Sequence, residues 1–179
     1  IVDPQTPVVT VDVARAGIVP SDVCYRRLNE LLDPEGVRQD HLFMTRVTDD
    51  EGNVTGAEIL GEKVGGTVDG GFVLFPDPMG ATGSSMSNVI EYYKQQVSGE
   101  SPQMVAMNLI ITPEFVRRMQ EEHPDVALYS FRLDRGASPS EVLDLVPGEE
   151  WERESGLDAD DYIVPGGGGF GELMNNSWV

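Results

Sequence analysis

Short runs of β-branched residues alternate along this chain with segments whose apolar residues recur at helical spacing. This pattern predicts strands at residues 8–13, 72–76, 104–111 and 126–133, and helices at residues 19–32, 86–97 and 113–123. Regular alternation of strands and helices is typical of a mostly parallel sheet whose two faces are both covered. We therefore predict the α/β fold class, with a mostly parallel twisted sheet and helices on both faces.

A β-hairpin flap is predicted beside this sheet. Residues 42–47 and 55–60 have the composition of strands, and the residues between them, 49–53, are turn-forming Asp, Glu, Gly and Asn. Residues 137–161 are rich in acidic side chains, and we expect them to form a long acidic insertion at the surface. No internal repeat breaks this order, so the whole chain, 1–179, is expected to form a single domain.

The charge of the chain limits what it can bind. There are 12 Lys and Arg residues against 31 Asp and Glu residues, which gives a formal net charge of -19 at pH 7. Such an acidic balance disfavours general electrostatic binding to nucleic acid or to an anionic membrane, so neither is an expected partner. A phosphate group would have to be bound locally, by backbone N–H groups and a few arginines.

Neither an internal disulfide nor a membrane span is expected. Cys24 is the single cysteine of the chain, and no apolar run reaches the roughly 20 residues that a membrane-spanning helix needs. These features predict a cytoplasmic protein. Because the chain begins at Ile1 rather than Met and has no basic region before an apolar stretch, we expect a missing N-terminal segment rather than a signal peptide.

One loop places small residues and hydroxyl groups where an anion could bind. Residues 75–85 leave a buried strand, pass through Asp77 and Thr82, and open a helix. Small residues let the backbone wrap closely around an anion, and a helix N-terminus supplies unpaired N–H groups. The loop has neither the Gly-Lys-Ser/Thr of a Walker loop nor the glycine spacing of a Rossmann loop, and its serines lack the frame of a nucleophilic serine. An ordinary tight turn is the alternative.

This loop resembles the phosphoribosyl-diphosphate loop of the uracil phosphoribosyltransferases, which usually reads Asp-Pro-Met-Leu-Ala-Thr-Gly-Gly-Ser. Between Asp77 and Ser85 the chain matches that form, except that Gly80 replaces the Leu and Ser84 replaces the second Gly. Three more stretches resemble family segments in the same order along the chain. They are the pyrophosphate loop at 13–17, the stretch before the last strands at 123–129, and the uracil-binding segment at 162–166.

The resemblance implies a type I phosphoribosyltransferase that converts uracil and 5-phosphoribosyl 1-diphosphate (PRPP) to UMP and pyrophosphate. It also implies Mg²⁺ as cofactor, with no side chain assigned as a metal ligand, and a homodimer or larger homo-oligomer. The implied catalytic residues are Arg15, Asp77 and Arg46. The implied PRPP-binding residues are Arg15, Ala16, Gly17, Arg46, Asp77, Pro78, Met79, Gly80, Ala81, Thr82, Gly83, Ser84, Ser85 and Gly169. The implied uracil-binding residues are Tyr162, Ile163, Gly168, Gly169 and Phe170.

A structural role is the alternative for some of these residues. Arg15 could be an ordinary surface arginine, and Arg46 could be one more charge on a solvated hairpin. His41 and His123 are far apart in the sequence and have too few acidic or cysteine neighbours to suggest a metal site, so both are expected to be structural.

Gly169 is a further departure from the family pattern. The family has Leu-Gly-Asp where this chain has three glycines ending at Gly169, and the family's Asp contacts the ribose of the donor or its magnesium. Loss of one such hydrogen bond costs about 1 kcal/mol, and more where a charged partner is left buried. Uracil recognition by backbone groups of Ile163, Gly168 and Phe170 can survive this change. Two alternatives stay open: a non-catalytic sensor of the same fold that binds a nucleotide or PRPP, and a phosphoribosyltransferase for another base.

Overall fold

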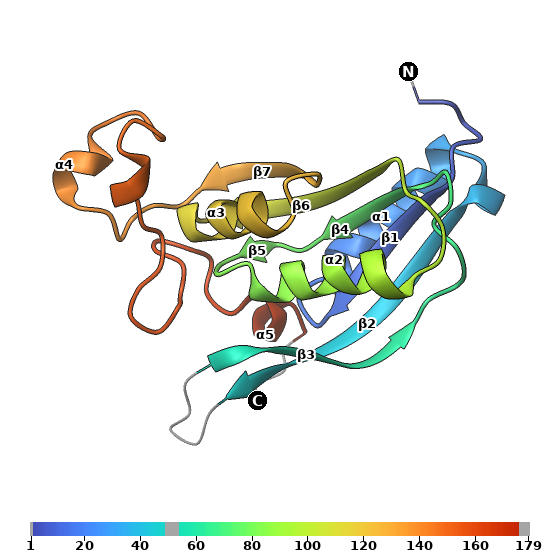
Figure 1. Cartoon of the computed structure of the whole chain (residues 1–179), viewed down its shortest axis with the longest axis horizontal. Helices are drawn as coiled ribbons and strands as arrows, with labels where there is room; N and C mark the ends of the chain where they lie inside the picture. The colour runs from blue at the N-terminus through green and yellow to red at the C-terminus, as the bar shows by residue number, and fades with distance from the viewer. Residues whose placement is uncertain (1, 49–53, 176–179) are drawn as a thin grey trace.

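The computed structural model describes residues 2–48 and 54–175 (Figure 1). Its strands are β1 (Val8–Ala14), β2 (Val37–Thr48), β3 (Val54–Lys63), β4 (Phe72–Pro76), β5 (Met79–Gly80), β6 (Gln103–Ile111) and β7 (Ala127–Leu133). Its α-helices are α1 (Ile18–Leu31), α2 (Ser84–Gln96), α3 (Pro113–Glu122), α4 (Ser140–Leu143) and α5 (Phe170–Asn175), and 3-10 turns lie at Pro34–Gly36 and Trp151–Arg153. Within the described ranges no helix has the length and apolar character that a membrane crossing requires.

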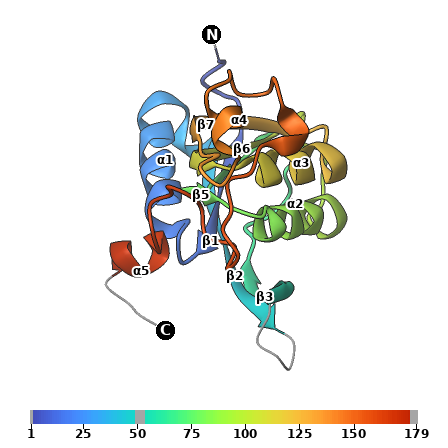
Figure 2. The ribbon, with the colours of Figure 1, turned by 90° about the vertical axis from the view of Figure 1, so that its left-hand side faces the viewer.

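The strands form one mostly parallel sheet, which confirms the predicted fold class. Their order is β3-β2-β1-β4-β6-β5, and β7 pairs with β6. The paired strands run parallel except β2 and β3, which are antiparallel. Figure 2 shows α1 on one face of the sheet and α2 and α3 on the other. The carboxyl ends of β1, β4 and β6 therefore lie at one edge, where loops lead from strands into helices.

The antiparallel pair β2–β3 is the predicted hairpin, and both strands are longer than predicted. The first half of β2 pairs with β1, from Val37 beside Val8 to Phe43 beside Ala14. The second half pairs only with β3 and projects beyond the sheet (Figure 2). The strand begins at Val37 and not at residue 42 because its first residues pair with β1. This pairing is tertiary, and local composition does not predict it. The predicted turn at 49–53 lies outside the described residues.

The hydrophobic core that anchors α2 lies between that helix and the sheet. Val73 and Phe75 of β4 and Ile90 of α2 have no exposed surface, and Tyr93 of α2 is 1% exposed. The rings of Phe75 and Tyr93 meet edge to face with their centroids 5.4 Å apart. Burial of each such side chain contributes about 1.5–3 kcal/mol. This packing fixes the N-terminus of α2 at the carboxyl edge of the sheet.

The helix α1 is present as predicted, but its apolar spacing does not mark its buried face. Val23 and Leu31 are 59% and 65% exposed, whereas Ser21 is fully buried. Ser21 lies inward because its hydroxyl oxygen accepts a hydrogen bond from Nε2 of Gln39 on β2, at 2.9 Å. A polar pair between helix and sheet, which helical periodicity cannot detect, sets the orientation of α1.

The acidic insertion, residues 137–161, is tied to the fold more closely than predicted. Most of it is exposed, but Glu154 is buried and forms an ion pair with Arg135 at 3.2 Å. The guanidinium of Arg117 on α3 lies over the ring of Trp151, 5.0 Å from its centroid. The buried ion pair therefore ties the insertion to the segment after β7, and the cation–π contact holds it against α3.

Candidate functional site

Three loops meet at the carboxyl edge of the parallel strands. They are the loop after β1, the loop between β4 and α2, and the segment before α5 (Figure 1). A Cβ built on Gly17 would lie 3.3 Å from the carbonyl oxygen of Pro76, and one built on Gly167 would lie 3.6 Å from Sδ of Met79. A Cβ on Gly171 would lie 3.5 Å from the backbone nitrogen of Ala16. The loop after β1 thus lies beside the end of β4 and the first turn of α5, and the segment before α5 lies beside the loop between β4 and α2.

Residues 77–85, which follow β4 and include the first two residues of α2, form the phosphate loop. It contains the two-residue strand β5, which sequence reasoning did not anticipate because only its pairing with β6 defines it. Gly83 has φ of 79° and precedes α2, so the chain turns there in the left-handed conformation that favours glycine. In the described chain, the N–H groups of Ser85 and Met86 in the first turn of α2 have no backbone acceptor. The phosphate loop therefore has the free donors that an anion would need.

Side chains from β6 and its C-terminal end hold the phosphate loop in place. The Thr112 hydroxyl donates to the carbonyl oxygen of Ala81 at 2.6 Å, and its backbone N–H donates to that of Gly80 at 3.1 Å. Nδ2 of Asn108 donates to the carbonyl oxygen of Asp77 at 2.8 Å. Both Thr112 and Asn108 are buried. The carbonyl groups of Asp77, Gly80 and Ala81 are thus engaged by the protein, whereas the N–H groups at the start of α2 remain available to a ligand.

Gly80, which replaces the Leu of the family pattern, packs directly on Phe115 of α3. A Cβ built on Gly80 would lie 2.6 Å from Cδ2 of the Phe115 ring, closer than side chains approach. Phe115 is 1% exposed and belongs to the hydrophobic core, so its ring occupies the space that a larger side chain at Gly80 would need. The replacement of Leu is explained by a bulky neighbour on the next helix.

Asp77 is the acidic residue of the phosphate loop. Its carboxylate oxygen Oδ1 accepts a hydrogen bond from the N–H of Met79 at 3.0 Å. Burial raises the pKa of Asp77 to about 6, and the hydrogen bond from Met79 acts in the opposite direction. At pH 7 the carboxylate is mostly ionised and can accept hydrogen bonds from hydroxyl groups.

A single carboxylate limits how a metal ion could bind here. In the described residues no group of three or more His, Cys, Asp or Glu side chains is placed to hold a metal. Mg²⁺ needs only one or two carboxylates when it also binds the phosphates of a substrate. The donor set at the phosphate loop, which is Asp77, therefore fits an ion that arrives with a diphosphate and not a resident ion held by protein alone.

The loop after β1, residues 15–17, turns directly from strand to helix. The Ala14–Arg15 peptide bond is cis. The N–H of Gly17 donates to the carbonyl oxygen of Val13 at 2.9 Å, and a Cβ on Gly17 would lie 2.7 Å from the nitrogen of Val13. Glycine is required at this position because the backbone approaches itself so closely. Arg15 is thereby placed at the carboxyl edge of β1.

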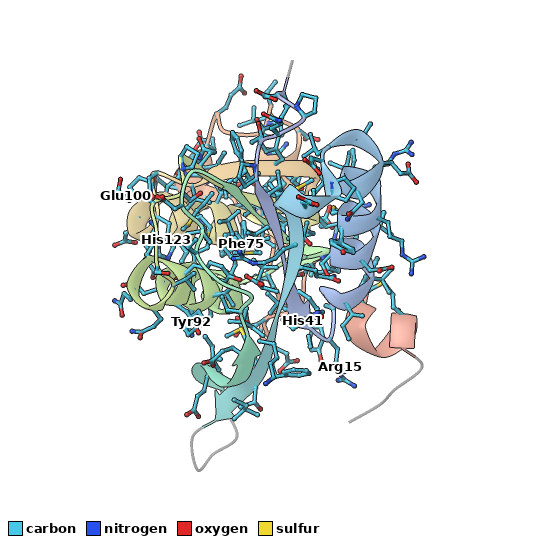
Figure 3. The ribbon with its side chains drawn as sticks, turned by 90° about the vertical axis from the view of Figure 1, so that its right-hand side faces the viewer. Arg15, His41, Phe75, Tyr92, Glu100 and His123 are labelled. Carbon is cyan, nitrogen blue, oxygen red and sulfur yellow. The ribbon has the colours of Figure 1, made fainter. Side chains whose placement is uncertain are left out.

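Arg15 and His41 lie toward the same end of the sheet (Figure 3). Nδ1 of His41 is 2.9 Å from Oδ2 of Asp12, a buried residue of β1. Burial raises the pKa of Asp12, and the hydrogen bond and charge of His41 act in the opposite direction.

Arg46 lies farther along β2, opposite Ala57 of β3, and its side chain is outside the described residues. His123 is buried, with Nε2 3.0 Å from the hydroxyl of Ser87.

The predicted base segment, residues 162–170, runs from the insertion to α5. Ile163 is 9% exposed, whereas Tyr162 is 57% exposed. Positive φ values occur at Gly166 (64°) and Gly168 (70°), and Gly169 is not among the positive-φ glycines of the described chain. Gly169 therefore has no backbone conformation that requires glycine, and the site has no carboxylate at this position.

Two residues near these loops were not predicted from the sequence. Asp134, directly after β7, accepts a hydrogen bond from the N–H of Gly166 at 2.8 Å and contacts Arg132. Arg118 of α3 lies against Gly83, since a Cβ built there would be 3.3 Å from Cδ of Arg118. An acidic residue at the carboxyl end of a strand is a signal that could have drawn attention to Asp134. Nothing in the local sequence marks Arg118, because the proximity of α3 to the phosphate loop is tertiary.

The sheet order, the hairpin and the loops at the carboxyl edge define an open α/β protein with the type I phosphoribosyltransferase fold. The chain belongs to the uracil phosphoribosyltransferase family, whose model matches residues 3–148. That match includes the loop after β1 and the phosphate loop, and it ends before the base segment.

Curated relatives carry the same family name. A uracil phosphoribosyltransferase of Burkholderia mallei is 35% identical over 99 residues, which are 55% of this chain and 36% of the relative. That of Caldanaerobacter subterraneus is 32% identical over 98 residues, with the same two shares. That of Thermococcus kodakarensis is 35% identical over 63 residues, 35% of this chain and 26% of the relative. The matched regions thus cover between 26% and 36% of the length of these relatives.

Solved structures share the fold. The AQ2163 protein of Aquifex aeolicus superposes with a TM-score of 0.67 at 19% identity, over 96% of this chain and 66% of that one. An adenine phosphoribosyl transferase of Trypanosoma brucei, solved with AMP, pyrophosphate and ribose-5-phosphate, gives 0.53 at 11% identity, over 84% and 65%. At these identities the likeness concerns the fold alone.

Proposed function

We propose that this protein is a uracil phosphoribosyltransferase, which transfers 5-phosphoribose from PRPP to uracil and releases UMP and pyrophosphate. The observation that carries the proposal is the phosphate loop. In a chain of this family it presents free N–H groups at the N-terminus of α2, near the loop after β1 that carries Arg15.

The two loops would bind the two charged ends of the donor. The N–H groups of the phosphate loop and the hydroxyls of Thr82, Ser84 and Ser85 would bind the 5-phosphate. Arg15 would bind the pyrophosphate, because a guanidinium matches phosphate oxygens in a bidentate manner. Arg46 on the hairpin would bind the same pyrophosphate group. Asp77, ionised at neutral pH, would accept hydrogen bonds from the ribose hydroxyls.

The proposed reaction needs no covalent nucleophile from the protein. The bond from ribose C1 to pyrophosphate breaks with its electron pair going to the leaving group, and N1 of uracil forms the new bond to C1 as its proton passes to water. The chain's part is to neutralise the leaving charge and to hold N1 in line with C1. Mg²⁺, bound with the diphosphate, would supply additional positive charge for the leaving group.

Uracil is proposed as the base because the backbone groups of the base segment are preserved. Ile163, Gly168 and Phe170 keep their positions in the family pattern, and main-chain groups do not depend on side-chain identity. Tyr162, the other residue assigned to the base, is exposed, so we propose its backbone and not its ring as the contact.

A second candidate is a sensor that binds PRPP or a nucleotide without turnover, and a third is a phosphoribosyltransferase for another base. Gly169 favours them, because the site lacks the carboxylate at that position. Incubation of the purified protein with PRPP, Mg²⁺ and each of uracil, adenine, guanine, hypoxanthine and xanthine, with release of pyrophosphate as the readout, separates the three. Release with uracil alone supports the proposal, and release with another base supports the third candidate. PRPP binding by calorimetry without release with any base supports the sensor.

The proposal extends to a cytoplasmic, single-domain chain that assembles as a homodimer or larger homo-oligomer. Size-exclusion chromatography with light scattering measures the assembly directly, and a monomer at micromolar concentration would contradict that part of the proposal.

A further inference from the structure

The side chain of Arg118 extends across the phosphate loop. A Cβ built on Gly83 would lie 3.3 Å from Cδ and 3.5 Å from Cβ of Arg118. The aliphatic part of Arg118 therefore covers the glycine that turns the loop into α2. The N-terminus of α3 is tied to the phosphate loop by Thr112. Nε of Arg118 faces Glu122, whose other carboxylate oxygen accepts a hydrogen bond from Ser87 in the first turn of α2, so the guanidinium lies near the start of α2.

The guanidinium of Arg118 is only weakly engaged. Its ion pair with Glu122 has an Nε–Oε1 distance of 3.7 Å, which is longer than a hydrogen bond, and both side chains are more than a third exposed. Such exposed pairs on one helix contribute little to stability. Glu122 has another partner, because its other carboxylate oxygen accepts a hydrogen bond from the hydroxyl of Ser87 on α2. Arg118 can therefore exchange Glu122 for a different anion at small cost.

An anion in the phosphate loop would need a positive charge at this point. The chain has a net charge of -19, and its overall field opposes the approach of a phosphate group. The loop itself, residues 77–85, contains no Lys, Arg or His. N–H groups and hydroxyls can satisfy phosphate oxygens, but they do not neutralise a dianion as a guanidinium does.

We infer that Arg118 binds the 5-phosphate of the donor, a phosphomonoester dianion, and that it gives up Glu122 to do so. This inference rests on the proposed function, because it takes the phosphate loop to be the site of the 5-phosphate. It divides the arginines by role: Arg118 serves the end of the donor that is retained in the product, and Arg15 serves the pyrophosphate that leaves.

Calorimetric titration of the whole chain with ribose 5-phosphate tests this contact without any chemistry. The variant Arg118→Met keeps the aliphatic stem over Gly83 and removes the charge, and we expect its Kd to rise about tenfold to a hundredfold. Glu122→Gln removes the competing charge and keeps an acceptor for the Ser87 hydroxyl, so its Kd should fall about twofold to threefold.

Arg26→Met is the matched control. Arg26 is an exposed arginine with an i,i+4 ion pair to Asp22, on α1 at the opposite face of the sheet, and its loss should leave the Kd unchanged. Equal Kd values for the unaltered chain, Arg118→Met and Arg26→Met would overturn the inference and leave the proposed function standing. Absence of ribose 5-phosphate binding by the unaltered chain would contradict both. If Arg118→Met does not unfold cooperatively, Glu122→Gln decides, and an unchanged Kd in that variant overturns the inference.

Discussion

The buried carboxylate of Asp134 accepts a hydrogen bond from the backbone N–H of Gly166, with 2.8 Å between Oδ2 and the nitrogen. Asp134 directly follows β7 and is 3% exposed, and Arg132 of the same strand holds its other oxygen at 2.6 Å. Nη2 of Arg132 also donates to the carbonyl oxygen of Gly166 at 3.2 Å. One acidic side chain thus holds Gly166, the first of the consecutive glycines of the base segment, at the end of the sheet.

We predict that Asp134→Ala impairs binding of the base more than binding of the donor. The change leaves the N–H of Gly166 without its acceptor, which should lower the free energy of unfolding by about 1–3 kcal/mol. The KM for uracil should rise about tenfold, equivalent to ~1.4 kcal/mol, because the base segment loses its anchor. Asp134→Asn keeps an oxygen acceptor, so its KM for uracil should lie between that of the unaltered chain and that of Asp134→Ala. Equal rises in the KM for uracil and for PRPP would argue for a general loss of structure instead.

The phosphate loop was predictable from the sequence, whereas the Asp134–Gly166 contact was not. Consecutive small and hydroxyl residues between an apolar strand and a helix, all within residues 72–90, identify the loop in the sequence. The contact joins residues 32 positions apart, on either side of the acidic insertion, and its partner atom is a backbone N–H that carries no residue-type signal. Local patterns specify elements and their loops, but they do not specify which loop another element holds.

Gly80 and Phe115 illustrate the same limit on the helix side. The sequence identifies Gly80 as a departure from the family pattern, but the reason lies in a ring 35 residues away that fills the space above it. The orientation of α1 is a further case, since the inward position of Ser21 depends on Gln39 of β2. Periodicity finds helices because it reflects burial, and it misplaces their buried face where a polar contact decides the orientation.

The Gly80–Phe115 contact leads to a prediction about stability. Gly80→Leu would place its Cβ 2.6 Å from the buried Phe115 ring, so we expect a destabilisation of about 1–3 kcal/mol from overpacking. Phe115→Ala alone should cost about 3–5 kcal/mol through the cavity it leaves. The double variant should cost less than the sum of the two, because the leucine occupies part of that cavity. Denaturant unfolding of all four proteins measures the coupling, and strict additivity would contradict the steric account.

The raised pKa of Asp77 makes two pH effects expected, with opposite senses. In the folded protein its pKa is about 6, compared with an ordinary value of 3.8. The folded state therefore binds more protons than the unfolded state between these pH values, and the contribution of Asp77 to stability is full below pH 3.8 and is lost as the pH rises to 6. In the proposed function the ionised carboxylate of Asp77 binds the ribose of the donor, so kcat/KM for PRPP should fall as the pH drops below 6.

Asp77→Asn provides the control for both effects. Its unfolding free energy, relative to that of the unaltered chain, should rise by roughly 2–3 kcal/mol between pH 4 and pH 7 in urea titrations. Its kcat/KM should be low at every pH and should lack the decline below pH 6. A decline that persists in Asp77→Asn would assign the titration to another group, and Asp12 beside His41, whose pKa is also raised by burial, is the first candidate.

Gly169 offers the sharpest test of whether the site lacks one functional group. Because its φ is not positive, aspartate can occupy this position without the strain that it would meet at Gly168, where φ is 70°. Gly169 directly precedes α5, and Asp is among the preferred residues before the first turn of a helix. The fold should therefore tolerate Gly169→Asp, and its melting temperature should be unchanged or slightly raised.

We predict that Gly169→Asp strengthens PRPP binding about tenfold, the lower end of the range for one charge-assisted hydrogen bond of ~1.5–3 kcal/mol. The gain stays at the lower end because the new carboxylate also has the N–H groups of α5 within reach as competing donors. Gly169→Asn is the matched control, since it caps the helix equally well without the charge. Calorimetry with PRPP and Mg²⁺ should give a higher PRPP affinity for Gly169→Asp than for Gly169→Asn, and a similar affinity for Gly169→Asn and the unaltered chain. Uracil affinity should stay constant, because the proposed contacts to the base are main-chain groups. Equal gains from Asp and Asn would mean that ordering of α5, and not the missing carboxylate, limits donor binding. No gain from either, in a protein that releases no pyrophosphate, would favour the sensor over the enzyme.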